Sequence, residues 1–227
     1  ETPPEEDLFI IQNPLETEPT LSNQWQEIIL FFKQMPSTMK QLAWVQFFTW
    51  LGMFCSILYF PSVVAHHIFG ATEENSLLYA QGIEWSGICI ATYNLVCLIF
   101  SFLLAKLTET IDRKLIHFTC LLFGSLSLVS LCLIHDRYIM FFPMICLGIT
   151  WSSILAIPYA ILANSIPSQN MGIYMGVFNA SIVIPQIIAL GLGWITINWL
   201  GNDPAIAIFL GGLSLAIAAL LVFRIED

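Results

Sequence analysis

The stretch MGIYMGVFNASIVIPQI, residues 171–187, decides the fold of this chain. It is apolar enough to lie in a membrane, yet it carries features that a simple lipid-facing anchor does not need. Gly172 and Gly176 lie four residues apart, and Asn179 is a polar side chain at membrane depth. Pro185-Gln186 interrupts the helix, and the carbonyl that proline leaves unpaired is tolerated only beside protein or a water-filled cavity. We therefore expect this helix to face a cavity or a closely packed neighbour.

The composition of the whole chain is that of a membrane protein. Of its 227 residues, 57% are hydrophobic and 10% are charged, whereas soluble domains carry about 25% charged residues. The net charge of −9 does not describe the apolar part, because seven of the sixteen acidic residues fall within the first 27 positions. The chain is not basic enough to suggest that it binds nucleic acid.

Cysteine and histidine do not point to a metal or a cofactor. The six cysteines all lie in apolar segments, without a CxxC motif or a neighbouring His/Asp cluster. This pattern favours free thiols that pack as small hydrophobic side chains. His66 and His67 follow the first apolar segment, but a metal site would need further ligands at suitable spacing. We expect these histidines to be interfacial anchors or residues of an outer gate.

Six apolar segments of about 20 residues, each long enough to cross a ~30 Å hydrocarbon core, predict an all-α membrane protein. The expected bundle of six transmembrane helices occupies residues 36–227, with helices near 41–64, 85–106, 115–134, 138–163, 171–197 and 204–223. Residues 1–35 read as an acidic, proline-containing linker that ends in a short amphipathic helix, 25–35. That helix could lie on the membrane surface or pack on the loops. A start within such a linker favours a piece of a longer protein.

The basic residues predict the orientation of the bundle. With the N-terminus inside, only Arg137 lies in an outer joint, and the inner segments hold Lys33, Lys40, Lys106, Arg113, Lys114 and Arg224. Cytoplasmic loops are enriched in Lys and Arg, so both termini are expected in the cytoplasm.

The joint KLTETIDRK, residues 106–114, resembles a loop of the major facilitator superfamily, between the second and third helices of each half. Asp112 and Arg113 match the G-x-x-x-D-R-x-G-R-type pattern of that loop, Lys114 is shifted, and the glycines are absent. The resemblance implies a cytoplasmic gate or loop motif at these three residues. A plain basic flank at a cytoplasmic helix end explains Arg113 and Lys114 equally well.

The last three segments resemble the final helices of sugar/proton symporters in the same superfamily, a group that includes plant sucrose transporters and bacterial glycoside permeases. The tenth helix of that group ends in Pro-Tyr-Ala, and the eleventh carries G-x-x-x-G-x-x-N followed by I-V-x-P-Q. The matching residues here are Pro158-Tyr159-Ala160, Gly172, Gly176, Asn179, 182–186 and, in the final outer loop, 201–205. The resemblance covers residues 36–225 and implies helices seven to twelve of a twelve-helix carrier, with residues 1–35 as its central cytoplasmic loop.

Sugar recognition needs neutral hydrogen-bonding groups for hydroxyls and flat aromatic faces for C–H surfaces. The resemblance implies that the first, second, fourth and fifth helices line the cavity, which gives as candidates Gln46, Trp50, Tyr93, Asn94, Trp151, Tyr159, Asn179 and Gln186. Each of them could instead serve a structural hydrogen bond or an interfacial anchor. Gly172 and Gly176 favour close helix packing. Pro158 and Pro185 are either static kinks or hinges.

No Asp, Glu, Lys or Arg lies deep within the six segments. Ionisable groups at membrane depth are functional by default, so a proton-coupling residue is expected in the N-terminal half. The expected function is symport of a sucrose- or maltose-like sugar with H+ by alternating access, in a plasma or bacterial inner membrane. A transporter of another small metabolite or drug, and a stand-alone six-helix channel or scaffold, are the alternatives. An enzyme is not expected, because the segments hold no paired carboxylates, Ser/His dyad or metal-ligand pair.

Overall fold

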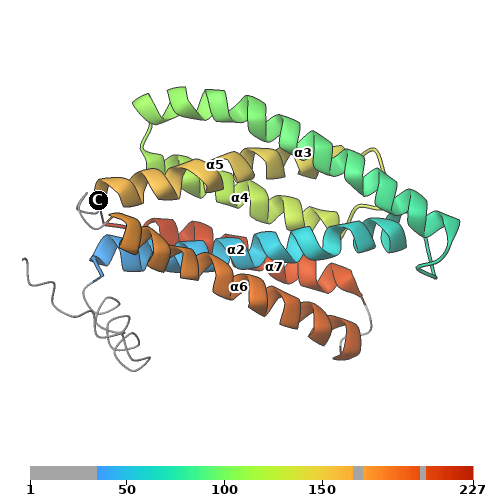
Figure 1. Ribbon diagram of the computed structural model, residues 1–227. Coiled ribbons are helices and arrows are strands. Elements are labelled where there is room, and N and C mark those ends of the chain that lie inside the picture. Colours follow the sequence, from blue (N-terminus) through green and yellow to red (C-terminus); the bar gives the residue numbers. More distant parts are fainter. Residues whose placement is uncertain (1–34, 166–170, 200–202, 227) are drawn as a thin grey trace, which may run out of the picture. The chain divides into compact units, whose positions relative to one another are not determined.

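The computed structural model describes residues 35–165, 171–199 and 203–226, and residues 36–227 form a compact unit of their own (Figure 1). The described elements are α2 (Ser37–Val63), a short π-helix η1 (Val64–Ile68), α3 (Leu77–Thr110), α4 (Arg113–Leu131), α5 (Phe141–Ser165), α6 (Met171–Trp199) and α7 (Pro204–Val222). Within these ranges, six helices are long and apolar enough to cross a membrane. The predicted all-α bundle of six transmembrane helices is thereby confirmed. The amphipathic helix expected at 25–35 falls almost entirely outside the described residues.

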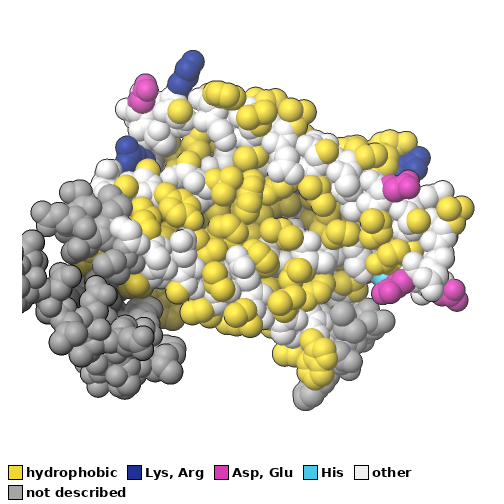
Figure 2. Space-filling model, in the orientation of Figure 1, with side chains coloured by type: hydrophobic (Ala, Val, Ile, Leu, Met, Phe, Trp, Pro, Cys, Tyr) yellow, Lys and Arg dark blue, Asp and Glu magenta, His cyan; other side chains and the backbone are white. Residues whose placement is uncertain are grey.

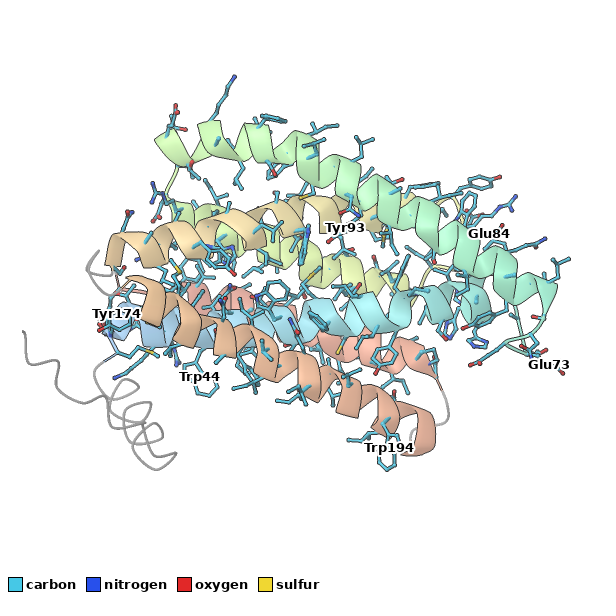
Figure 3. All side chains as sticks on the ribbon, in the orientation of Figure 1. Trp44, Glu73, Glu84, Tyr93, Tyr174 and Trp194 are labelled. Carbon is cyan, nitrogen blue, oxygen red and sulfur yellow. The ribbon has the colours of Figure 1, made fainter. Side chains whose placement is uncertain are left out.

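Helix α3 begins eight residues earlier than the apolar segment predicts. The hydroxyl of Ser76 accepts a hydrogen bond from the backbone N–H of Tyr79 at 3.2 Å and caps the first turn. Glu84, expected just before the helix, therefore lies within it (Figure 3). At 34 residues the helix is about 50 Å long, since each residue adds 1.5 Å. It is thus longer than a ~30 Å hydrocarbon core requires.

The six helices form two layers. α3, α5, α2 and α6 make up one layer in this order, since α5 packs on α3, α2 packs on α6, and α2 meets α5 between them. α4 and α7 form the second layer and pack on each other, with α4 against α5 and α7 against α2 (Figure 1). In the apolar membrane-crossing stretch of α3 only 17% of the residues are buried, and in that of α6 only 22%, against 50% or more in the other four helices. The two edge helices of the first layer therefore present largely uncovered faces.

Glycines set the closest helix contacts. A Cβ atom at Gly52 would lie 2.6 Å from the carbonyl oxygen of Gly211, so α2 and α7 meet backbone to backbone. Gly148 makes the same kind of contact between α5 and α3, and small residues are what permit such approaches in membranes. Gly172 and Gly176 differ, because a Cβ at either would meet nothing within 4 Å among the described residues. The close packing predicted for them is not found inside this unit.

Polar side chains join α4 to α5 at three levels. The bonds run from Thr150 Oγ1 to the Cys120 carbonyl, from Ser127 Oγ to the Pro143 carbonyl, and between His117 Nδ1 and Ser153 Oγ, each 2.7 Å long. Hydrogen bonds between helices stabilise membrane bundles, since lipid offers these groups no partner. They hold the first layer to the second.

The two ends of the bundle differ in charge. We call one the basic end, with Lys40, Lys106, Arg113, Lys114 and Arg224 beside Glu109, Asp112 and Glu226, and the other the acidic end, with Glu73, Glu74, Asp136 and Asp203 beside Arg137. Figure 2 shows charged side chains gathered at the ends of the unit and hydrophobic ones between them. Such a pattern is expected of a bundle whose middle lies in lipid.

Candidate functional site

The first layer carries three aromatic residues from three helices, which we call the aromatic cluster: Trp50 of α2, Tyr93 of α3 and Trp151 of α5. The rings of Trp50 and Trp151 meet edge to face, with centroids 5.5 Å apart and planes at 76°. The rings of Tyr93 and Trp151 are 6.1 Å apart at 46°. All three side chains are half-buried. The structure thus brings together three of the residues that the sequence marks as candidates.

The glycine contacts explain why these rings meet. A Cβ at Gly148 would lie 2.6 Å from the carbonyl oxygen of Tyr93, so α3 lies directly against α5 at this level. Trp151 follows Gly148 by about one helical turn and therefore lies on the same side of α5. On α2, Gly52 turns toward α7, and Trp50, two residues earlier, points to the opposite side of its helix.

Buried polar atoms without partners adjoin the cluster on α2. Both amide atoms of Gln46, the hydroxyl of Thr49 and the indole nitrogen of Trp50 are buried and find no hydrogen-bond partner among the described residues. The three residues lie at i, i+3 and i+4, on one side of the helix. Gln46 and Thr49 are fully buried, so neither lies on the surface of the layer. Each unpaired buried polar group costs roughly 1–3 kcal/mol, which calls for a functional or water-mediated explanation.

The remaining candidates form no single group with the cluster. Tyr159 of α5 meets Phe178 of α6 edge to face at 5.9 Å. Tyr159 follows Trp151 by eight residues, about 12 Å along the helix. Asn179, beside Phe178, is exposed, and Gln186 lies two turns further along α6 and is half-buried.

The side-chain amide of Asn94 makes a hydrogen bond within its own helix. Its amide nitrogen donates to the carbonyl of Ile90 at 2.8 Å, and the residue is exposed on α3. The two prolines marked as kinks or hinges, Pro158 and Pro185, both lie inside helices that continue past them.

His117 of α4 is a membrane-depth ionisable residue that the sequence survey passed over. It is fully buried, its Nδ1 lies 2.7 Å from Ser153 Oγ, and its Nε2 has no partner among the described residues. The absence of Asp, Glu, Lys and Arg from the apolar segments does not reveal this residue. Histidine also titrates near neutral pH, so its presence in an apolar segment is the signal in the sequence.

The KLTETIDRK joint makes two hydrogen bonds at the basic end of the unit. Asp112 caps α4 by accepting the backbone N–H of Lys114 at 2.9 Å, and Lys114 Nζ donates to the carbonyl of Ile225 at 2.7 Å. Arg113 is exposed and lines a cavity of about 210 Å³ together with Asp112, Ile161 and Asn164. Two of the three motif residues therefore make structural contacts, one within α4 and one to the C-terminal end of the unit.

At the acidic end, His67 Nε2 lies 2.9 Å from Asp203 Oδ1 and links η1 to the start of α7. His66 Nδ1 contacts the carbonyl of Ala71 at 2.7 Å. Both histidines line a polar cavity of about 400 Å³ with Thr72, Glu74 and Asp203. The described residues include no group of three or more His, Cys, Asp or Glu arranged to hold a metal ion.

Comparisons with known proteins give the family. The profile of the Major Facilitator Superfamily matches residues 42–227. The chain is 27% identical over 228 residues to the sucrose transport protein SUC4 of Arabidopsis thaliana, covering 88% of this chain and 44% of that protein. It is 24% identical over 229 residues to the sucrose transport protein SUT1 of Oryza sativa subsp. japonica, covering 85% and 43%. The chain therefore spans less than half the length of these relatives. It is an integral multi-pass membrane protein and belongs to the Major Facilitator Superfamily.

Proposed function

We propose that this chain is the C-terminal six-helix half of a carrier that transports a sucrose- or maltose-like sugar. The relatives are sucrose transport proteins of about twice its length. Its last three helices match the motifs of the final helices in sugar symporters. A missing six-helix half accounts for the uncovered faces of α3 and α6.

The aromatic cluster is the observation that carries the proposal. Trp50, Tyr93 and Trp151 offer ring faces and edges to the C–H surfaces of a sugar, at the middle of three apolar helices. The unpaired polar atoms of Gln46, Thr49 and Trp50 are buried beside the rings, so a sugar would reach their neutral hydrogen-bonding groups only in a conformation that uncovers them. Ligand sites of this kind combine apolar walls with a few polar groups that fix orientation.

The layer arrangement supports a mechanism of alternating access. The face of α3, α5, α2 and α6 would pack against the N-terminal half, with the sugar between the halves near the midplane. α4 and α7 would stay on the lipid side. With the basic end in the cytoplasm, as the excess of Lys and Arg there favours, both termini are cytoplasmic.

Proton coupling completes the proposed mechanism. We assign the coupling group to the N-terminal half, because His117 contacts a neutral serine and has no described acidic partner. Entry of one proton with the sugar would supply about 2.3 kcal/mol per 100 mV of membrane potential.

Uptake of labelled sucrose and maltose by the full-length protein in proteoliposomes tests the proposal. Accumulation of sugar that increases when the outside is made acidic is the expected result. Uptake that ignores the imposed pH gradient would refute proton symport, and absence of uptake of both disaccharides would refute the sugar assignment.

A further inference from the structure

The joint between α4 and α5, residues 132–140, is fixed against α3 at the acidic end, and we call it the α4–α5 joint. Asp136 Oδ1 accepts the backbone N–H groups of Tyr138 and Ile139 at 2.8 and 3.1 Å. The indole nitrogen of Trp85, on α3, donates to the backbone carbonyl of Arg137 at 3.1 Å. The backbone of Arg137 is therefore held by a turn on one side and by α3 on the other.

Two aromatic rings position the guanidinium group of Arg137. Its central carbon lies 4.8 Å from the ring centroid of Tyr138 and 5.4 Å from that of Trp85. The two rings themselves meet edge to face, with centroids 5.6 Å apart. A cation within about 6 Å of a ring centroid is attracted to the face of the ring. The side chain of Arg137 thus has a preferred place on the surface of the joint.

Most of the N–H donors of this guanidinium have no partner in the protein. A guanidinium presents a planar fork of donors and no acceptor. Arg137 uses one of them, from Nη2 to the hydroxyl of Tyr138 at 3.0 Å. No Asp or Glu among the described residues forms an ion pair with it. Such a fork matches the oxygens of a phosphate group.

The surface around the joint is apolar. Leu133, Ile139 and Phe142 are 73%, 58% and 72% exposed. In a membrane bundle, large apolar side chains exposed on the outside contact acyl chains, and aromatic residues such as the two rings gather at the level of the lipid headgroups. Arginine near a helix end likewise extends its charge to that level. The guanidinium of Arg137 is therefore expected at the depth of lipid phosphates, with acyl chains beside it.

The charges around Arg137 select the kind of headgroup. No other Lys or Arg lies in the joints of the acidic end. Asp136 precedes Arg137 in the chain, Glu84 precedes Trp85 on α3 (Figure 3), and both acidic residues are exposed. Like charges repel, so these carboxylates disfavour a wholly anionic ligand. They favour a ligand that carries an ammonium group close to its phosphate.

We propose that the α4–α5 joint binds a zwitterionic phospholipid such as phosphatidylethanolamine. The phosphate accepts hydrogen bonds from the guanidinium of Arg137, and the ammonium group is attracted by Asp136 and Glu84. The acyl chains lie on the exposed apolar side chains around the joint. This binding requires neither a sugar nor the transport cycle, so it is independent of the proposed function.

Photocrosslinking of the full-length protein in detergent locates and measures the site. The probe is a phosphatidylethanolamine with a diazirine near the glycerol end of one acyl chain, and peptide mass spectrometry identifies the labelled residues. Saturable labelling within residues 132–142 is expected. Arg137→Gln should raise the half-saturating probe concentration at this segment at least about tenfold, because a charge-assisted hydrogen bond is lost. An unchanged concentration in that variant would overturn the proposal.

Arg113→Gln is the matched control. It removes an exposed arginine at the opposite, basic end, and should leave the half-saturating concentration at 132–142 within about twofold. An equal rise in both variants would show a general effect of charge and overturn a local site. The Gln variant of Arg137 should fold normally, because the hydrogen bond from Trp85 uses the backbone of residue 137.

Three further ligands test the chemistry of the headgroup. A diacylglycerol probe with the same chains lacks the phosphate and should bind at least about tenfold more weakly; equal binding would reduce the site to apolar contact. A phosphatidylglycerol probe lacks the ammonium and should also bind more weakly, and tighter binding would overturn the zwitterionic assignment. Soluble glycerophosphoethanolamine should not displace the lipid probe at equal concentration. If it does, the ligand is a free phosphoester and the lipid assignment is wrong.

Discussion

Trp50 and Trp151 meet edge to face at the seam between two groups of helices. α2 packs mainly on α6 and α7, and α5 packs mainly on α3 and α4. The ring pair, with centroids 5.5 Å apart, joins the two groups within the first layer. Such pairs contribute about 0.5–1.5 kcal/mol beyond the area they bury. A ligand that contacts either ring would therefore act at the junction of both groups.

Gly148→Ala should destabilise the unit, because the added Cβ would lie 2.6 Å from the Tyr93 carbonyl, a backbone atom that cannot rotate away. We expect a loss of about 1–3 kcal/mol in the free energy of unfolding, measured by denaturant titration in bicelles. Gly191→Ala is the control, because nothing described lies within 4 Å of its Cβ position. Equal stability of the two variants would contradict the close α3–α5 contact.

Ser153→Ala should leave the buried imidazole of His117 without its partner. The expected loss of unfolding free energy is about 1–3 kcal/mol. Ser152→Ala is a matched control, because that neighbouring buried hydroxyl donates within its own helix, to the Ile149 carbonyl. In a His117→Ala background Ser153→Ala should cost much less, and an undiminished cost would show that the two side chains do not interact.

Asp203 performs two tasks with one oxygen, since its Oδ1 caps Ala205 N–H of α7 at 2.9 Å and contacts His67. Asp203→Ala removes both contacts and should lower stability by about 0.5–2 kcal/mol, the usual value of a helix cap. Asp203→Asn keeps the capping oxygen and should cost less. The same unfolding measurement on His67→Ala gives the second contact alone, and a loss as large as that of Asp203→Ala would mean that the cap contributes little.

A substitution at Gly176 tests whether the N-terminal half packs against this part of α6. Outside its own helix, none of the described residues lies within 4 Å of the Cβ position of Gly176, so Gly176→Leu should leave the membrane insertion of the protein unchanged. If the N-terminal half approaches closely here, as glycines at helix interfaces allow, uptake should fall at least about tenfold. Gly87→Leu, also at an empty position, serves for comparison on α3. Normal uptake by the Gly176→Leu protein would remove the packing role from this residue.

The sequence was sufficient for the six helices and insufficient for their contacts. Long apolar runs predict membrane crossings because lipid satisfies no backbone group. Hydropathy marks only the immersed part of a helix, so the cap at Ser76 and the early start of α3 were not predicted. The π-helix η1 after Val63, which lies against α3, was not predicted either.

For the candidate site, too, the sequence predicts the residues but not the contacts between them. Trp50, Tyr93 and Trp151 stand out as aromatic residues in apolar segments, but their meeting depends on how each helix is rotated and how closely α3 approaches α5. The spacing of Gly172 and Gly176 predicts close helix packing there. Among the described residues, close contacts to a neighbouring backbone lie at other glycines, such as Gly52 and Gly148, which no motif marks.

The most direct test of the sugar site is the Michaelis constant for sucrose or maltose uptake by the full-length protein carrying Trp50→Ala or Trp151→Ala. Loss of a ring that contacts the sugar should raise KM at least about tenfold, and the Phe variants should retain much of the affinity. Trp44→Ala, an exposed ring on the same helix as Trp50, should leave KM within about twofold. Unchanged KM in both Trp50→Ala and Trp151→Ala would contradict the assignment of the aromatic cluster as the sugar site.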